Sequence, residues 1–142
     1  MFITDDEVID VIVYYRQVGR VYLSYKESDF NENIKEEDKV KYKKLTVSMR
    51  ILTWGLYNEL QDAAWLRDEN MEKSTWSNKK YKEEKLKKII VKWDATMKNK
   101  KGEEIPAPIN SNTIMSMSPN IAETILSAYD ERSIFSEEEL KK

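Results

Sequence analysis

Apolar and polar residues alternate in two segments of the N-terminal half, Arg20–Lys26 and Lys43–Leu52. A period of two predicts β-strands, with one face apolar and the other polar. Between them, Ser28–Lys39 is polar and shows no period, which predicts a surface loop. Two alternating segments joined by a loop predict an antiparallel pair. Such a pair is marginal in water, so we expect it to pack on helices or on another chain's strand. The alternating apolar positions are Val21, Leu23, Tyr25, Leu45, Val47, Met49 and Ile51.

The first segment of the chain carries two conflicting signals. Thr4 and Glu7 have the spacing of a helix capping box, and the apolar residues that follow recur near helical spacing. These features predict a helix over Asp5–Val18 that ends at Gly19. However, every residue of Val11–Tyr15 is β-branched or aromatic, which favours a strand. The helix is our expectation, and a strand is the alternative.

Two longer helices are predicted in the middle of the chain. Thr53 is a natural N-cap for a helix that extends to about Asp68. A polar joint over Asn70–Asn78 carries Trp76, and a second helix is expected over Asn78–Thr96. The apolar stripe of the second helix follows the i, i+3, i+4, i+7 spacing and consists of Leu86, Ile89, Ile90 and Trp93.

The segment after Gly102 begins with an extended piece. Ile105–Ile109 contains two prolines, which are incompatible with a helix. Ser111 or Asn112 is expected to cap a short helical turn. The apolar residues of this turn are Ile114, Met115 and Met117.

The last predicted helix begins at Ser118–Pro119, because serine is favoured at the N-cap and proline at the first helical position. Residues 136–142 are expected to fray or to form a single turn. The apolar stripe of this helix is Ile121, Ala122, Ile125, Leu126 and Tyr129.

These elements together predict an α+β fold that is mostly α, with a small antiparallel β-hairpin packed on three to four helices. The length of 142 residues is typical of a single domain. Within it we distinguish residues 1–40, whose fold the pattern leaves open, a helical core over residues 41–131, and a frayed tail over residues 132–142.

The composition excludes most catalytic chemistry. The chain has no Cys and no His, so it can form no thiolate nucleophile, zinc–thiolate site or imidazole base. Its three glycines are isolated, and no phosphate-binding loop is present. The acidic run Asp5–Glu7 is better explained by helix capping than by cation binding, and Glu36–Asp38 lacks the glycine of a calcium-binding loop. We therefore expect no enzyme activity, no catalytic residue, no cofactor and no metal site.

The sequence shows no membrane or export signal either. The N-terminus lacks a basic region ahead of an apolar one, so no secretion signal is predicted. The longest apolar candidate, Val8–Tyr15, is far shorter than a membrane span and is interrupted by Asp10.

Charge is distributed unevenly along the chain. The net charge is −2, but residues 1–38 carry −6, residues 39–101 carry +9 and residues 102–142 carry −5. Such a chain can neutralise itself within one fold, or between copies in a ring, where salt should weaken the contact.

The basic part raises the alternative of a nucleic-acid-binding module, with Tyr81 and Trp93 as stacking rings. Arginine is absent from the run, the acidic ends would repel phosphate, and lysines often cover the wet face of a helix, so nucleic acid is an unlikely partner. The lysines concerned are Lys79, Lys80, Lys82, Lys85, Lys87, Lys88, Lys92, Lys98, Lys100 and Lys101.

Four segments follow one another in an order that carries a resemblance. Arg50–Gly55 (RILTWG) leads into a helix, and Leu86–Trp93 ends a lysine-rich helix in an aromatic residue. Lys101–Pro106 then forms a glycine-to-proline turn, and Ser118–Tyr129 is the closing helix. This layout resembles that of bacteriophage tail assembly chaperones and related small tail or baseplate morphogenesis proteins. It covers about two-thirds of the chain and leaves residues 1–40 unexplained.

The resemblance implies a binding function without catalysis. Chaperones of this kind hold the long, helical tape measure protein until tail tube subunits polymerise around it. The implied partners are therefore other tail proteins, the tape measure or tube and baseplate subunits, together with a possible homo-oligomer. The implied location is the host cell cytoplasm during assembly. The related alternative is a structural subunit of the virion, in the tail, baseplate or head–tail connector ring.

Candidate partner-binding residues are the aromatic, methionine and apolar positions of the resembling segments. Large rings and methionines are common at protein interfaces. The proline-flanked segment could also add to a partner's sheet edge. The candidates are Trp54, Tyr57, Leu86, Ile90, Trp93, Ile105, Met115, Met117, Ile125 and Tyr129.

Overall fold

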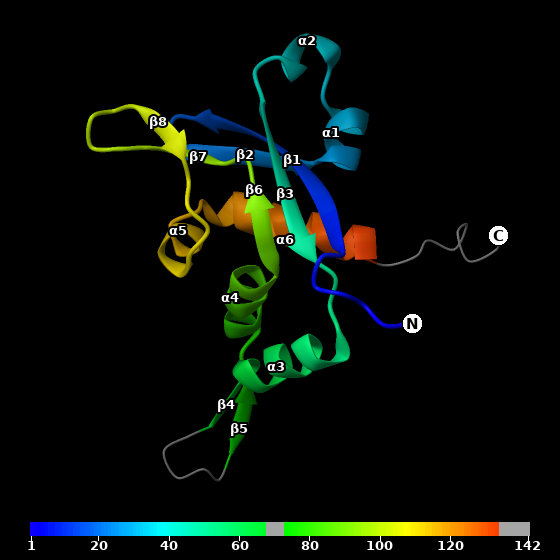
Figure 1. Cartoon of the computed structure of the whole chain (residues 1–142). Coiled ribbons are helices and arrows are strands. Elements are labelled where there is room, and N and C mark those ends of the chain that lie inside the picture. Colours follow the sequence, from blue (N-terminus) through cyan, green and yellow to red (C-terminus); the bar gives the residue numbers. More distant parts are fainter. Residues whose placement is uncertain (68–72, 134–142) are drawn as a thin grey trace, which may run out of the picture.

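The computed structural model describes residues 1–67 and 73–133, in which helix and strand are nearly balanced. Helices cover 42% of these residues and strands cover 32%. The expected fold class, mostly α with a small hairpin on three to four helices, is therefore wrong. The protein is a mixed α/β fold built on a four-stranded antiparallel sheet with two further two-stranded sheets (Figure 1).

The main sheet has the strand order β2-β1-β3-β6. The two alternating segments are strands as predicted, but they do not pair with each other. The long strand β1 lies between them and pairs antiparallel with both, from Val18 opposite Val21 on one side to Val8 opposite Arg50 on the other. The predicted direct pair is therefore wrong. The strands are β1 (Val8–Val18), β2 (Val21–Lys26), β3 (Lys43–Arg50) and β6 (Ile90–Trp93).

The N-terminal segment is the strand β1, and the predicted helix is wrong. Thr4 caps only a turn, in which the Glu7 amide donates to the Thr4 carbonyl at 3.1 Å. The β-branched and aromatic side chains fit a pleated surface, and hydrogen bonds to neighbouring strands on both sides outweigh the capping signal. Gly19 has a φ of +63°, a conformation that suits the two-residue hairpin turn between β1 and β2.

Two short helices replace the loop expected over Ser28–Lys39. They are α1 (Glu27–Asn33) and α2 (Glu36–Lys39). Phe30 anchors them, because its buried ring stacks on Tyr14 with the ring centroids 4.0 Å apart and meets the edge of Tyr42 at 5.2 Å. One buried ring is enough to hold a mostly polar segment against the sheet. The absence of an apolar period therefore did not exclude helices in this segment.

The third helix starts where the sequence predicts and ends early. In α3 (Trp54–Ala64) the Thr53 hydroxyl accepts from the Leu56 amide at 3.1 Å, which confirms the N-cap. The chain then forms the hairpin of β4 (Trp65–Arg67) and β5 (Ser74–Trp76). The expected helix end at Asp68 and residues 70–72 of the expected joint lie outside the described residues.

The lysine-rich helix is also shorter than predicted. α4 (Asn78–Ile89) gives way to β6, which pairs with β3. The register shifts between Ser48 and Met49, so that Ile90 lies opposite Met49 and Trp93 lies opposite Val47. Because of this irregularity, Ile90 and Trp93, which are three positions apart in sequence, lie opposite two residues of β3 that face the core. The spacing of Ile90 and Trp93, which predicted a helix, therefore belongs to a strand.

The C-terminal third agrees with the prediction in outline. The extended, proline-bearing piece contributes a strand to a small hairpin, and the short helix is present, although its cap is Asn110, which accepts from the Thr113 amide at 2.9 Å. The closing helix begins at Pro119 and includes Arg132 and Ser133, which were expected to belong to a frayed tail. Residues 134–142 lie outside the described part. The elements are β7 (Thr96–Lys98), β8 (Glu104–Pro106), α5 (Ser111–Met115) and α6 (Pro119–Ser133).

The hydrophobic core lies between α6 and one face of the main sheet (Figure 1). The predicted stripe of α6 is buried there, with Ile125 and Tyr129 almost fully enclosed. The Tyr129 hydroxyl donates to the Arg50 carbonyl at 2.9 Å, and the Asn120 amide donates to the Tyr22 carbonyl at 2.8 Å. These bonds fix the helix against the ends of two strands. The strand residues of the core are Val11, Val13, Leu45, Val47, Met49 and Ile90.

A buried lysine joins α4 to α6. The ammonium of Lys85 lies 2.9 Å from the Asp130 carboxylate. It also lies 5.0 Å from the centre of the Tyr129 ring and 5.6 Å from that of Tyr81, within the range of cation–π attraction. A buried ammonium is tolerated here because a carboxylate and two aromatic faces replace water around it.

We predict that Ile125→Ala lowers the free energy of unfolding by about 2–5 kcal/mol, because it leaves a cavity in a fully packed core. Urea denaturation followed by circular dichroism measures this. The control is Met115→Ala, whose side chain is half exposed and which should change stability by less than about 0.5 kcal/mol. Equal effects of the two substitutions would contradict the placement of α6.

We predict a pH-dependent contribution from the ion pair of Lys26 and Glu131, whose charged atoms are 2.7 Å apart. The hydrogen bond from Lys26 holds the pKa of Glu131 below its ordinary value of 4.5, and the same bond raises the pKa of Lys26 above 10.5. The stabilisation is therefore present above pH 4.5 and lost as pH falls through the lowered pKa of Glu131; it is also lost as pH rises through the raised pKa of Lys26.

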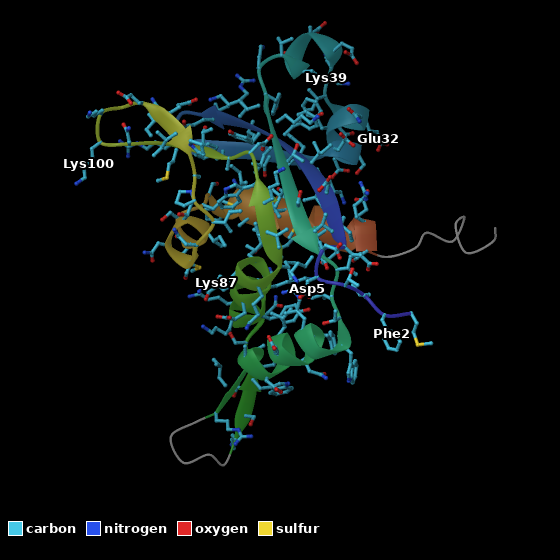
Figure 2. All side chains as sticks on the ribbon, in the orientation of Figure 1. Phe2, Asp5, Glu32, Lys39, Lys87 and Lys100 are labelled. Carbon is cyan, nitrogen blue, oxygen red and sulfur yellow. The ribbon has the colours of Figure 1, made fainter. Side chains whose placement is uncertain are left out.

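Glu131→Gln should accordingly be less stable than the unmodified chain near pH 7 and equally stable at strongly acidic pH. Thermal unfolding across this pH range tests the difference. Glu32→Gln, on the exposed helix α1 (Figure 2), is the control and should follow the unmodified chain throughout. A Glu131→Gln difference that persists unchanged at acidic pH would exclude this ion pair as its cause.

Candidate functional site

An open groove of about 730 Å³ lies where the β1–β2 turn, the β6–β7 connection, α5 and the start of α6 meet. Its volume is within the range of ligand-binding pockets. We call it the apolar groove, because aromatic and methionine side chains make up most of its large lining residues. The large side chains that line it are Tyr15, Tyr22, Trp93, Met97, Met117 and Ile121.

The two tyrosines come from the hairpin of β1 and β2. Their ring centroids are 6.3 Å apart, a tilted contact. Burial raises the pKa of Tyr15, and the carboxylates of Asp94 and Glu104 raise it further. This side of the groove is therefore partly shielded from water.

Trp93 forms a second wall and is held in place by a hydrogen bond. Its indole N–H donates to the Ala107 carbonyl at 2.8 Å, and the Ala107 amide donates to the Ala95 carbonyl at 2.9 Å. These two bonds tie the end of β6 to the segment that follows β8. The ring is half-buried, so one part packs on the core while another remains available to a ligand.

The connection between α5 and α6 closes the groove with a mixed surface. Met117 packs partly on the core, whereas Asn112, Thr113 and Ser116 contribute polar groups to the lining. A rim of hydroxyl and amide groups around an apolar floor can orient a ligand by hydrogen bonds while the floor supplies affinity.

A second exposed apolar surface lies on the hairpin of β4 and β5. Trp65 pairs with Trp76 across the strands, with ring centroids 5.5 Å apart, and Trp76 lies 5.4 Å from Tyr81. The exposed fractions are 48% for Trp65, 48% for Leu66 and 36% for Trp76. We call Trp65–Arg67 and Ser74–Trp76 the tryptophan arm. It leaves the lower end of the molecule, away from α5 and the β7–β8 hairpin (Figure 1).

Another exposed aromatic pair marks the start of α3. Trp54 and Tyr57 are one helical turn apart and stack with a centroid distance of 5.8 Å. Trp54 is 77% exposed, which is unusual for a tryptophan of a folded chain. Neither ring lines the apolar groove, so the pair is an exposed patch outside it.

The predicted partner-binding residues separate into three groups. Those that are buried in the core, where a partner could not reach them, are Leu86, Ile90, Ile125 and Tyr129. Those that line the apolar groove are Trp93 and Met117. Those that are exposed elsewhere are Trp54, Tyr57, Ile105 and Met115.

Sequence reasoning missed Tyr15, Tyr22 and Met97 in the groove, and the whole tryptophan arm. The signal for the tyrosines was present: Gly19–Arg20 is a two-residue turn, and a hairpin around it brings the two rings to the same end of the sheet. The arm had a signal too, because two tryptophans flank a polar segment, as the strands of a hairpin would.

The lysine-rich segment is partly neutralised within the fold. Figure 2 places Lys87 on α4 and Lys100 on the loop between β7 and β8, well apart, so these lysines form no single stripe. Four α4 lysines lie within ion-pair distance of carboxylates, which lowers the charge available to a phosphate backbone. The pairs are Lys80–Glu84 at 3.2 Å, Lys82–Glu123 at 3.0 Å, Lys85–Asp130 at 2.9 Å and Lys88–Glu59 at 3.4 Å.

Within residues 1–67 and 73–133, no cluster of three or more His, Cys, Asp or Glu side chains is arranged to hold a metal ion. The helices of the same residues are too short or too polar to span a bilayer. Comparison of the chain with protein-family models, with curated proteins and with solved structures finds no match.

We predict that Trp93→Phe lowers the free energy of unfolding by about 0.5–1.5 kcal/mol, because a smaller aromatic ring replaces the indole and the hydrogen bond to Ala107 is lost. Chemical denaturation measures the change. Trp54→Phe is the matched control, since that indole is mostly exposed and should tolerate the substitution without measurable loss. If the two variants are equally stable, the Trp93 bond does not hold this wall of the groove.

Proposed function

We propose that this chain is a non-enzymatic protein of bacteriophage tail morphogenesis, and that it acts as an assembly chaperone by holding an amphipathic helix of a tail protein such as the tape measure protein. The assignment to phage tails rests on the order of the four resembling segments. The mode of action rests on the apolar groove, which is the observation that supports binding over catalysis.

The shape and lining of the groove suit a helix better than a small molecule. An amphipathic helix presents apolar side chains at i, i+3, i+4 and i+7, and these need an open trough with an apolar floor. The groove is open, its lining includes three aromatic rings and two methionines, and polar residues such as Asn112 and Ser116 lie among them.

Methionine supports the choice of a long, repetitive client. Met97 and Met117 lie in the lining, and their flexible thioether side chains can adapt to different apolar neighbours. A chaperone for a long helical protein must accept many similar but unequal segments. Adaptable side chains serve that purpose better than a rigid pocket does.

A structural subunit of the virion is the second candidate, and the tryptophan arm favours it. An arm with three exposed apolar side chains is more typical of a permanent contact than of transient binding. The third alternative, nucleic-acid binding, gains no comparable support, because four lysines of α4 lie beside carboxylates.

We predict that co-expression of this chain raises the soluble fraction of the tape measure protein encoded by the same phage genome. A groove variant with Val21→Glu and Met97→Glu should lose this effect. Both residues line the groove and are exposed, so the charges block an apolar ligand without entering the core. The control Val40→Glu places one glutamate at an exposed valine of the α2 end and should retain the effect.

The readout is the ratio of soluble to total tape measure protein, with the folding of each variant checked by circular dichroism. If the unmodified chain fails to solubilise the tape measure protein and the other long helical tail proteins of that genome, the chaperone proposal is wrong. Stoichiometric presence in purified virions, measured by mass spectrometry, would favour the second candidate.

A further inference from the structure

We infer that the β7–β8 hairpin is a flap of the apolar groove, which turns about its base at Ala95 and Ala107 between the open position of the structure and a closed position over the groove. The flap is the segment Thr96–Pro106. In the closed position its apolar side chains, Met97 and Ile105, cover the groove. The motion needs no client, so the inference goes beyond the proposed function and does not depend on the identity of a ligand.

The flap projects from the fold and packs mainly on itself (Figure 1). All the residues of β7 and β8 are exposed, on both faces of their small sheet. The two strands contact each other more than they contact any other element. A two-stranded sheet without further packing is only marginally stable in water, so contact with a neighbouring apolar surface would stabilise it.

The turn at the tip of the flap is held by a set of hydrogen bonds. The Asn99 amide donates to the Glu103 carbonyl, and the Gly102 amide donates to the Asn99 carbonyl, each at 3.0 Å. The side-chain oxygen of Asn99 also accepts from the amides of Lys101 at 2.9 Å and Glu103 at 3.0 Å. Gly102 has a φ of +79°, which glycine adopts without strain. Because the tip is fixed in this way, the flap moves as a unit and any bending is concentrated at its base.

The base of the flap consists of two small residues that are tied to the core. The Ala107 amide donates to the Ala95 carbonyl at 2.9 Å, and the Trp93 indole donates to the Ala107 carbonyl at 2.8 Å. Within the described ranges, no ion pair joins a charged residue of the flap to another element. Small residues at the ends of an element are common hinge positions, and these two form the boundary between a fixed and a free part of the chain.

The flap carries an apolar pair beside the groove. Met97 and Ile105 lie opposite each other across the two strands, so their side chains are on the same face of the flap, and both are exposed. Met97 already lines the groove, whereas Ile105 does not. A turn about the base that carries Met97 further over the groove carries Ile105 with it. Both side chains then leave water, and this burial favours the closed position.

Closure of the flap gives the groove an occupant from its own chain. The rings and methionines of the lining are then covered while no ligand is bound, and a ligand enters only when the flap is open. The apparent affinity of any ligand therefore falls in proportion to the fraction of molecules in which the flap is open. Residues of the flap face would control binding without being part of the open groove.

Distances between two spin labels on the full-length chain, measured by double electron–electron resonance, test the inference. The chain contains no Cys, so labels attach only to introduced cysteines. The tip pair combines Lys100→Cys on the flap with Glu32→Cys on α1, which lie well apart (Figure 2). Helix α1 is a fixed reference because Phe30 is buried. We expect two distances for the tip pair, and one distance for a reference pair of Lys87→Cys on α4 with Glu32→Cys.

Substitutions on the two faces of the flap identify the surface that closes. In the tip pair, Ile105→Thr keeps a β-branched residue in the strand and should lower the ratio of closed to open molecules at least about fivefold, because less apolar area is buried. Met97→Thr is a second variant of the same face and should act in the same direction. Lys98→Thr is the matched control on the opposite face and should leave the ratio unchanged.

A single distance for the tip pair, as narrow as that of the reference pair, would overturn the inference. A ratio that Ile105→Thr and Met97→Thr leave unchanged, or that Lys98→Thr lowers equally, would overturn it as well. The distances are measured without a client. Failure of the chain to solubilise the tape measure protein, with two distances still present for the tip pair, would therefore count against the proposed function alone.

Discussion

The contact between α6 and the inner face of the main sheet is the constraint on which the rest of the structure depends. The strand β3 alternates apolar and polar residues, and Val11 and Val13 of β1 join its buried residues. The apolar face that the two strands form would be exposed to water without the helix. Ile125 and Tyr129 fill that face, and the Tyr129 hydroxyl satisfies the carbonyl of Arg50 at the end of β3. The first turn of the same helix, with Pro119 and Ile121, forms one wall of the groove. Core stability and groove shape are therefore properties of one helix.

Local sequence signals were sufficient to predict an element where packing against other elements does not alter the element's own apolar pattern. The N-cap at Thr53, the alternation of β3 and the stripe of α6 could all be predicted, because each follows from residues close in sequence. The strand β6 could not. Ile90 and Trp93 have helical spacing only because the register with β3 is irregular, and that register depends on residues more than 40 positions away. The capping box before β1 failed to predict the element correctly for a related reason. The hydrogen bonds of β1 to strands on both sides outweigh a local helix cap.

The residues of the candidate site divide in the same way, into those that a local pattern predicts and those that depend on the fold. Half of its predicted residues came from periodic apolar stripes, and a periodic stripe usually marks the side of a helix that faces the core. Leu86 and Ile125 are therefore buried, as a stripe requires, and are unable to contact a partner in the folded chain. Trp93 is the exception among the stripe residues, since its half-buried ring lines the groove. Trp65 and Trp76 lie on a short hairpin outside the predicted stripes and are exposed. A large ring in a segment with no other apolar period is the better indicator of a binding surface in this chain.

Ion pairs inside the fold balance part of the uneven charge of the chain. The acidic–basic–acidic pattern allowed neutralisation either within one fold or between copies. The structure shows neutralisation within the chain, since Lys82 and Lys85 of the basic part meet Glu123 and Asp130 of the acidic C-terminal part. Exposed pairs such as that of Lys82 and Glu123 contribute about 0–1 kcal/mol each, so this pairing balances charge more than it stabilises the fold.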